Sequence, residues 1–431
     1  MKYKRSVMII LCMALLSSVC FISPSQIQAD SGKKTLTWFV WATLDIPKQL
    51  SEVVFSSFPE LRDKVEIKGQ LFSSDVVLMQ KLRLMKASGE PMPDICMMQN
   101  FMLPELVRSN TLEDVSKVMR PYKSKMTVGA YKLVSYQNKQ YAFPYQLKPL
   151  IWVYREDMFA KAGVDPEKIK TTNDFIAAGK KIQKIYPKSY IWHLSSSSPN
   201  VSFLNRLLSG NGARFSDENG NYIVDKDPGI RKVFQDIKKI YDSGVCMDIV
   251  EDTTDYQQAF ANETIISDLT GAWIKNNLPQ YAPAQAGKWA EAQWPKIGGT
   301  VGGSDAGGSM WGVPKNAPHK KEAIEFLTKL TLTKEGALGS FKARKIYPSL
   351  LSVTEDPLIK EPDKYLGASL PVAEAEAIKK FKVFNFSPKY SSEIQIINQY
   401  FSKYIQGKMT LDKALKAANM DLQTQIGNAY K

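Results

Sequence analysis

Cysteine and histidine are both scarce in this sequence. Its 431 residues include four cysteines and two histidines, and no group of them has the spacing of a zinc site. Cys12 and Cys20 lie in an apolar N-terminal segment, so Cys96 and Cys246 are left for the folded part. A disulfide-rich scaffold is therefore excluded. Both remaining thiols are expected to be free and buried, and no metal ion or other cofactor is predicted.

The short motifs of common enzyme classes are also absent. The sequence has no serine nucleophile elbow, no glycine-rich phosphate loop and no zinc-binding helix. A retaining glycosidase needs two carboxylates that face each other, and Asp268 with Glu263 or Asp305 can be proposed as such a pair. Nothing in the sequence places these acids together. We therefore predict no catalytic residues and expect a protein that is not an enzyme, with a secreted glycoside-active enzyme as an alternative.

No block of basic residues accompanies the positive net charge. The formal charge is +14, and it is +11 when the three cations of residues 2–5 are left out. Lysines alternate with acidic residues in segments of helical periodicity such as 320–322 and 376–380. This distribution is typical of solvated helix faces, and an anionic partner such as a wall polymer or membrane surface is the alternative. No nucleic-acid partner is predicted.

A long apolar run occurs only at the N-terminus. Residues 7–19 are apolar, follow three cations and give way to polar residues, which is typical of a secretory signal peptide and too short for a membrane span. Ala29 offers a small residue for cleavage, so we expect residues 1–29 to be removed and the mature chain to lie in the periplasm or on the outer cell surface. The alternative is a lipid anchor at Cys20, although Val19 stands where lipoprotein processing sites have a small residue.

Segments with strand and helix periodicity alternate along the first part of the chain. Strand-like runs at 35–41, 65–69 and 94–98 are interleaved with helix-like runs at 46–55 and 75–87. Such alternation predicts an α/β fold with a doubly wound sheet. The chain is longer than an average domain and predicts two, and its last part, 370–430, has helical periodicity.

The stretch 140–157 (QYAFPYQLKPLIWVYRED) organises the middle of the chain. Two apolar strand-like runs flank Pro144, which cannot donate a hydrogen bond to a sheet and marks a bend or an edge. We interpret the stretch as a crossing between two lobes, with Tyr145 and Gln146 facing the cleft between them. An ordinary hairpin corner within one domain is the alternative.

Five sequence segments, taken in order, resemble one known family. They are PDICMMQN with LPEL within 93–106, YAFPY with VYREDMFAKAG within 141–163, LSGNG with DENG within 208–220, IISDLTGAW at 265–273, and GGSMWGVPK with KEAIEFL within 307–327. Together they resemble the extracellular solute-binding proteins that include maltose-binding protein, which are the receptors of carbohydrate ABC importers. The resemblance covers nearly the whole mature chain.

The resemblance implies an α/β, periplasmic-binding-protein-like fold with two discontinuous, hinge-connected lobes and a helical C-terminal tail. The N-terminal lobe is expected to hold 33–143 and 306–348, and the C-terminal lobe 144–305 and 349–431. Hinges are expected at Pro144 and at the glycine-rich return 302–306, because glycine tolerates large backbone changes.

A sugar site needs aromatic platforms for ring faces and hydrogen-bonding groups for hydroxyls, placed beyond the carboxyl ends of the strands. The candidate ligand-binding residues are Trp41, Thr43, Gln99, Asn100, Tyr145, Gln146, Ser198, Asn200, Trp273, Gly308 and Tyr390. Gln99 and Asn100 can instead cap the next helix turn, and Ser198 and Asn200 can be plain loop residues. The aromatic residues expected in cores are Trp38, Trp152, Trp192, Trp311 and His193.

The resemblance also implies a function. A receptor without catalytic activity would capture a sugar or oligosaccharide by hinge closure and present it to the membrane permease subunits of an ABC importer. It would act as a monomer. A receptor of the same fold for a peptide, a polyamine or an anionic sugar stays open, because the net charge of the chain does not report the charge of the cleft.

Overall fold

The computed structural model describes residues 32–197, 201–299, 308–363, 365–366, 378, 384 and 386–431. The expected signal peptide, Cys20, Ser198, Asn200, Asp305 and the return hinge at 302–306 lie outside this part of the chain. Within it, no helix combines the length and the apolar character that crossing a membrane requires.

Five strands form the sheet of the first lobe, in the order β2-β1-β3-β12-β6. β1 pairs in parallel with β2 and β3, whereas β12 is antiparallel to β3 and β6. The strands are β1 (Lys34–Trp41), β2 (Val65–Phe72), β3 (Ile95–Gln99), β6 (Ala142–Gln146) and β12 (Ser309–Gly312), beside a small hairpin of β4 (Ser135–Tyr136) and β5 (Lys139–Gln140). The helices are α2 (Asp45–Ser57), α3 (Pro59–Lys64), α4 (Asp75–Ser88), α5 (Leu103–Arg108), α6 (Ser116–Met119), α7 (Val128–Leu133), α14 (Lys320–Leu332), α15 (Lys334–Arg344) and α16 (Leu351–Thr354).

The second lobe is built on an antiparallel sheet of three strands, in the order β10-β7-β11, and a parallel pair, β8-β9. A bridge between Tyr190 and Ile265 connects the two. The strands are β7 (Leu150–Arg155), β8 (Trp192–Leu194), β9 (Cys246–Asp248), β10 (Ser267–Gly271) and β11 (Trp289–Ala292). The helices are α8 (Glu156–Lys161), α9 (Thr172–Ile185), α10 (Val201–Asn211), α11 (Pro228–Ser243), α12 (Thr254–Ala261), α13 (Ile274–Tyr281), α18 (Tyr390–Ile405) and α19 (Leu411–Gln425).

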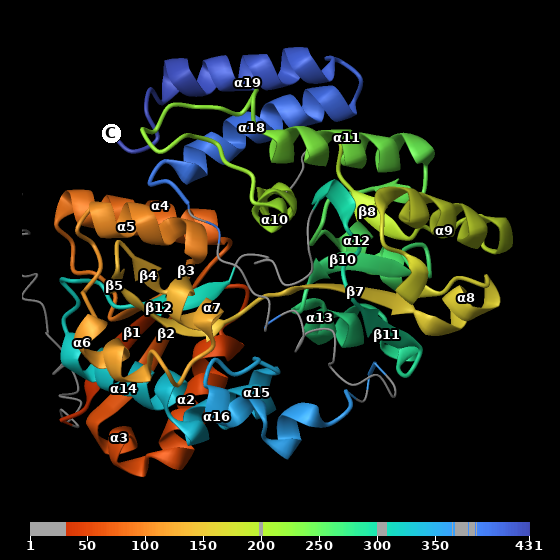
Figure 1. Cartoon of the computed structure of the whole chain (residues 1–431). Helices are drawn as coiled ribbons and strands as arrows, with labels where there is room; N and C mark the ends of the chain where they lie inside the picture. Colours follow the sequence, from red (N-terminus) through yellow and green to blue (C-terminus); the bar gives the residue numbers. More distant parts are fainter. Residues whose placement is uncertain are drawn as a thin grey trace, which may run out of the picture.

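The chain crosses between the two sheets at 147–149, as the stretch around Pro144 predicted (Figure 1). β6 belongs to the first sheet and β7 to the second. Pro144 does not interrupt the first strand, because β6 continues through it to Gln146. β6 is an edge strand, and its register with β12 shifts next to Pro144. A proline at such an irregular edge removes no ladder hydrogen bond that the sheet needs.

Each lobe has its own apolar core. In the first, the rings of Trp38 and Trp311 meet edge to face, with 4.8 Å between their centroids. In the second, Trp152 and Trp192 both pack against Phe175. All four tryptophans are buried, as the sequence predicted. Aromatic packing is therefore part of the core beneath each sheet.

The boundary expected at Pro348 is too early in the chain. Leu350, Val353 and Ile359 pack into the core of the first lobe. Tyr365 and Leu366 pack against the second sheet, whereas Ile378 belongs again to the core of the first lobe. The first lobe therefore includes core residues well beyond Pro348.

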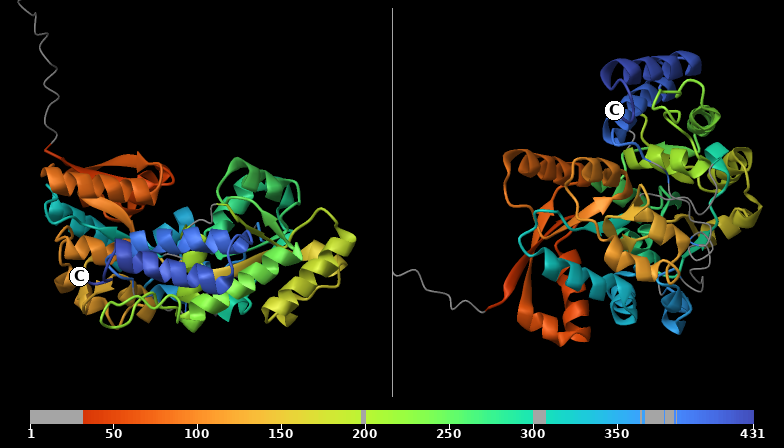
Figure 2. Two further views of the ribbon diagram at one scale, coloured as in Figure 1. Left: turned by 90° about the horizontal axis from the view of Figure 1, so that it is seen from above. Right: turned by 60° about the vertical axis from the view of Figure 1, so that its left-hand side comes forward.

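Helices α18 and α19 close the second lobe. They pack on each other and on α11, and the two further views show them along one side of that lobe (Figure 2). Asp227 is the N-cap of α11, and its side chain accepts a hydrogen bond from the backbone of Ile230; Gly244, in the left-handed region, is the C-cap. The predicted helical tail is thus present as two helices that pack on α11.

Both described cysteines are free and buried, as predicted. Burial raises the pKa of the Cys96 thiol and of the Cys246 thiol to about 12 each. Since the thiolate is the reactive form, neither side chain should react with thiol reagents in the folded protein near neutral pH.

Candidate functional site

The carboxyl end of the first sheet brings several predicted residues together. Ser309 begins β12, and its pairing partners are Gln99, the last residue of β3, and Gln146, the last residue of β6. Trp41 ends β1 at the same edge and is half-buried. In α/β proteins, ligands usually bind beyond the carboxyl ends of the strands, which is where these side chains lie.

The turn after β1 has an uncommon backbone conformation. Ala42 has a φ of 73°, in the left-handed region that residues other than glycine seldom adopt. Thr43 follows it, and its hydroxyl accepts a hydrogen bond from the backbone N–H of Asp45, the first residue of α2. Strain of this kind is concentrated at functional sites, which is consistent with a role for this edge.

Gln99 links the sheet edge to a carboxylate. Its side chain hydrogen-bonds Asp75, the first residue of α4, and the positive charge of Lys148 also acts on that carboxylate. Burial nevertheless raises the pKa of Asp75 above its usual value. Gln99 also caps the turn Asn100–Met102, the alternative that the sequence left open for it. The hydroxyl of Ser309 is buried and has no hydrogen-bond partner among the described residues, so it is available to a ligand.

Trp273 follows β10, and its half-buried ring lies near two cations. Nζ of Lys148 is 5.4 Å from the ring centroid, and Cζ of Arg206 is 5.5 Å from it. Because Lys148 also acts on Asp75, one side chain of the crossing segment connects Trp273 with the edge of the first sheet. Trp273 thus lies close to groups of both lobes.

A second contact joins the lobes beside Trp273. Asn276 in α13 donates a hydrogen bond of 3.3 Å to the backbone oxygen of Arg344, at the end of α15 in the first lobe. The guanidinium of Arg344 also bonds to Gln49 of α2, at 2.8 Å. The start of α13 is therefore in direct contact with the first lobe.

Arg206 is fixed next to the Trp273 ring by buried partners. Its guanidinium donates to both carboxylate oxygens of Glu251 and, at 2.8 Å, to the hydroxyl of Thr270. Breaking such a buried ion pair costs roughly 3–5 kcal/mol, so the guanidinium has little freedom to move. Burial and the charge of Glu251 raise the pKa of Asp252, which lies beside this pair, to about 6.

His193 belongs to the same polar region and is structural, as predicted. Nδ1 of His193 lies 3.1 Å from Oδ1 of Asp268, and the hydroxyl of Tyr256 donates to Oδ2 of Asp268 at 2.9 Å. Burial lowers the pKa of His193, but the charge and hydrogen bond of Asp268 together with the charge of Glu251 outweigh it, and the net direction is upward. Glu263 instead pairs with Arg155 at 2.7 Å. The two described acids considered as a catalytic pair therefore have separate partners.

Tyr145 and Asn100 are buried. The ring of Tyr145 packs on Trp311, with 4.3 Å between centroids, and its hydroxyl bonds to Arg344. Burial raises the pKa of Tyr145 against the opposing effect of that arginine. The backbone N–H of Asn100 donates to the carbonyl of Gly308 at 3.1 Å. Both predicted residues lie at the sheet edge, and each is already engaged by the protein itself.

Tyr390 lies in the core of the second lobe. Its hydroxyl donates to Oδ1 of Asn205 at 2.6 Å, and its ring stacks on Phe215. Phe101, two residues after Gln99, reaches this ring from the first lobe at 5.9 Å between centroids. Tyr390 is therefore next to the lobe junction but buried, in a different cluster from Trp273.

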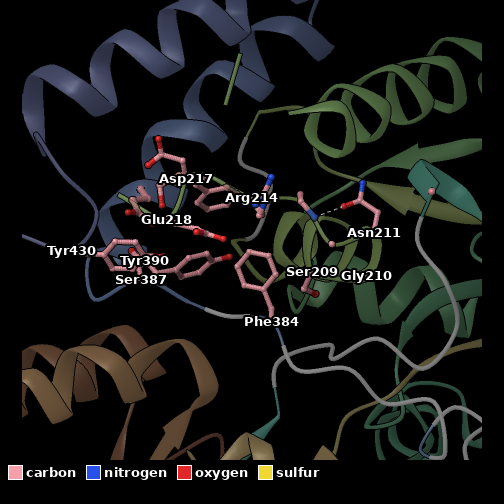
Figure 3. A pocket seen from close by; sticks show the side chains of 16 residues that line it. Ser209, Gly210, Asn211, Arg214, Asp217, Glu218, Phe384, Ser387, Tyr390 and Tyr430 are labelled. Atoms are coloured by element: carbon pink, nitrogen blue, oxygen red, sulfur yellow. Dashed lines mark hydrogen bonds between the residues drawn. The ribbon is translucent and has the colours of Figure 1, made fainter. Parts of the chain in front are cut away.

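Tyr390 also lines a hollow of about 630 Å³ in the second lobe (Figure 3). Its walls come from the end of α10 and the segment after it, residues 209–218, and from the C-terminal part of the chain, with Ser387, Glu393 and Tyr430. A larger hollow of about 1170 Å³ lies between α7 and Phe386, and Asn100 is the predicted residue on its wall. Trp273 and Gln99 line neither hollow.

Several residues near Trp273 or at the facing edge of the first lobe were not predicted from the sequence. They are Asp75, Lys148, Arg206, Gly271 and Arg344. Lys148 lies in the crossing stretch itself, which is a signal that could have been used. Arg206 is a single charged residue in the apolar helix 201–208, and an arginine in such a place is seldom buried unless it has a partner.

Known proteins are similar to this chain in sequence and in fold. The family model described as bacterial extracellular solute-binding protein matches residues 62–366. A lactose-binding protein of Rhizobium radiobacter is 24% identical over 304 residues, 67% of this chain and 69% of that protein. An arabinooligosaccharide-binding protein of Bacillus subtilis (strain 168) is 25% identical over 285 residues, 64% of this chain and 65% of that protein, slightly less than two thirds.

A solved structure with the same fold is the ABC transporter associated binding protein from B. animalis subsp. lactis Bl-04, in complex with β-1,6-galactobiose. It superposes with a TM-score of 0.76 and 23% sequence identity, covering 93% of this chain and all of that chain. At this level of identity the likeness establishes the fold, a pair of lobes of the periplasmic-binding-protein type, and leaves the ligand to be argued from the site.

Proposed function

Because the chain belongs to the bacterial extracellular solute-binding protein family, we propose that it is the sugar receptor of an ABC importer. It captures a sugar or oligosaccharide between its two lobes and presents the closed form to the permease subunits. The relatives with similar sequences support this class of ligand, since their names specify lactose and arabinooligosaccharides.

The observation that carries the proposal is the position of Trp273. A half-buried indole lies beside Lys148, whose positive charge also acts on the carboxylate of Asp75 in the first lobe. An aromatic face with hydrogen-bonding groups around it suits a sugar, whose ring faces are apolar and whose rim carries hydroxyls. We place the sugar between Trp273 and the edge formed by Trp41, Gln99 and Ser309.

The charges around Trp273 favour a neutral ligand. Arg206 is matched by Glu251, Lys275 lies 3.6 Å from Glu291, and the charge of Lys148 faces Asp75. An anionic sugar or a peptide carboxylate would have to compete with these carboxylates for the cations. The site is therefore suited to uncharged oligosaccharides more than to uronates or to a peptide carboxylate.

We propose binding without chemical change. The two described acids considered as a glycosidase pair have other partners, His193 and Tyr256 for Asp268, and Arg155 for Glu263. Both are used in the structure of the second lobe. A receptor role explains the same residues without assigning them to catalysis.

The proposal also covers the export of the protein and its attachment to the cell. The family places the mature protein outside the cytoplasm. We propose that residues 1–29 direct export, with a lipid anchor at Cys20 as the alternative, and that the receptor acts as a monomer. Mass spectrometry of the mature N-terminus separates the two: a chain that begins at Asp30 supports release, and a lipidated Cys20 supports anchoring.

The proposed function is tested by thermal unfolding with a panel of ligands. Lactose, β-1,6-galactobiose and arabinotriose are compared with digalacturonate, spermidine and tetra-alanine. We expect at least one neutral sugar to raise the melting temperature, because a ligand at 100 times its Kd stabilises the folded state by about 2.7 kcal/mol. A shift with digalacturonate, spermidine or tetra-alanine alone, or with none of the sugars, would overturn the proposal.

A further inference from the structure

The ring of Trp273 lies directly on the backbone of Gly271. A Cβ atom added to Gly271 would be 1.8 Å from Cζ3 of the indole and 2.3 Å from Cε3. Non-bonded carbon atoms keep about 3.5–4.0 Å between them, so even a methyl group here would displace the ring by more than ~1 Å. Gly271 pairs with Leu150 of β7, so the sheet holds its backbone in place. The ring therefore has to move, and the strand does not.

The backbone conformation of Gly271 does not by itself require glycine. Its φ is not positive, unlike that of Gly244 or Gly298. An alanine could adopt the same strand conformation without strain. The absence of a side chain at position 271 is therefore needed only to leave room for the indole of Trp273.

We propose that Gly271 is a positioning residue for ligand binding. It allows the indole to rest on β10 next to Arg206, and this contact sets where a sugar meets the ring. The role in affinity rests on the proposed function, whereas the contact between Gly271 and the ring does not. Displacing a binding surface by about 1 Å weakens binding even when every contact residue is still present.

Tryptophan fluorescence tests the contact without any ligand. Of the eight tryptophans, six are buried, and Trp41 and Trp273 are half-buried. In a Trp41→Phe background, quenching by acrylamide therefore reports mainly on Trp273. Gly271→Ala is expected to increase the quenching constant, because the ring leaves its contact with β10. Thr270→Ser, which keeps the hydroxyl bonded to Arg206, is the matched control and should leave the constant unchanged. Equal quenching with glycine and with alanine at 271 would overturn the inference.

Calorimetry then tests the consequence for binding. Gly271→Ala is titrated with whichever of lactose, β-1,6-galactobiose and arabinotriose binds the parent. We expect Kd to rise at least about 10-fold. Increased quenching with an unchanged Kd would show that the ring moves without affecting the sugar. That result would contradict the role of Trp273 in sugar binding. The conclusion that Gly271 allows the indole to pack on β10 would still stand.

Discussion

Trp273→Ala is expected to weaken sugar binding roughly 50- to 100-fold. A sugar that covers ~100 Å² of the indole face gains about 2.5 kcal/mol at ~25 cal/mol per Å², and this contribution is lost with the ring. The ring is half-buried and follows the end of β10, so the unliganded variant should keep its fold. Isothermal titration of parent and variant with the same sugar measures the effect.

Trp273→Phe is the matched control for this substitution. It keeps an aromatic face of smaller area and should retain affinity between those of the parent and the alanine variant. Melting temperatures without sugar show whether either substitution disturbs the fold. Parent-like affinity in Trp273→Ala would remove the indole from the binding site.

Glu393→Gln is expected to stabilise the folded protein above pH 7 by up to about 3 kcal/mol, and to have no such effect below pH 4.5. Burial raises the pKa of this carboxyl to about 7, against the opposing hydrogen bonds from Ser387 and Tyr222. The carboxyl keeps its proton in the folded state, whereas the unfolded chain releases it near pH 4.5. The stability of the parent therefore falls between pH 4.5 and pH 7, since the folded state binds more protons.

Glutamine has no proton to release at this position and still offers an acceptor to Tyr222, which donates to Oε1 of Glu393 at 3.0 Å. Urea unfolding at pH 4 and pH 8 measures the difference in the free energy of unfolding. Glu335→Gln, at an exposed position of α15, is the control and should show no comparable change with pH. If Glu393→Gln changed stability equally at both pH values, the buried, protonated carboxyl would be contradicted.

The lobes and their crossing could be predicted because their signals are local. Alternating strand and helix periods specify an α/β fold, and two apolar runs separated by Pro144 and a few polar residues specify a change of sheet. The lobe boundary was placed too early because helix α16 follows Pro348 without any change in composition. Its place in the first core depends on Leu350 and Val353, which pack against distant residues.

The candidate site could be outlined only in part for the same reason. Trp41 and Gln99 end strands and Trp273 follows one, so their positions in the sequence made them candidates. Arg206 is fixed by Glu251 and Thr270, which lie 45 and 64 residues further along the chain. Asp75 is affected by Gln99 and Lys148, which are also distant in sequence, and no spacing rule reports such partners. Tyr390 was chosen by resemblance, and its ring is buried against Phe215, a contact that sequence order does not show.

Closure of the two lobes on a sugar is the central claim, and the distance between them tests it most directly. Spin labels at Leu84→Cys in α4 and Ile185→Cys in α9 report on the two lobes, because both positions are exposed. Cys96 and Cys246 are buried and should not be labelled. A second pair within one lobe, Ile185→Cys and Met420→Cys, is the control. We predict that a sugar that raises the melting temperature shortens the first distance and leaves the second unchanged. The same sugar bound with no change in the first distance would contradict the account.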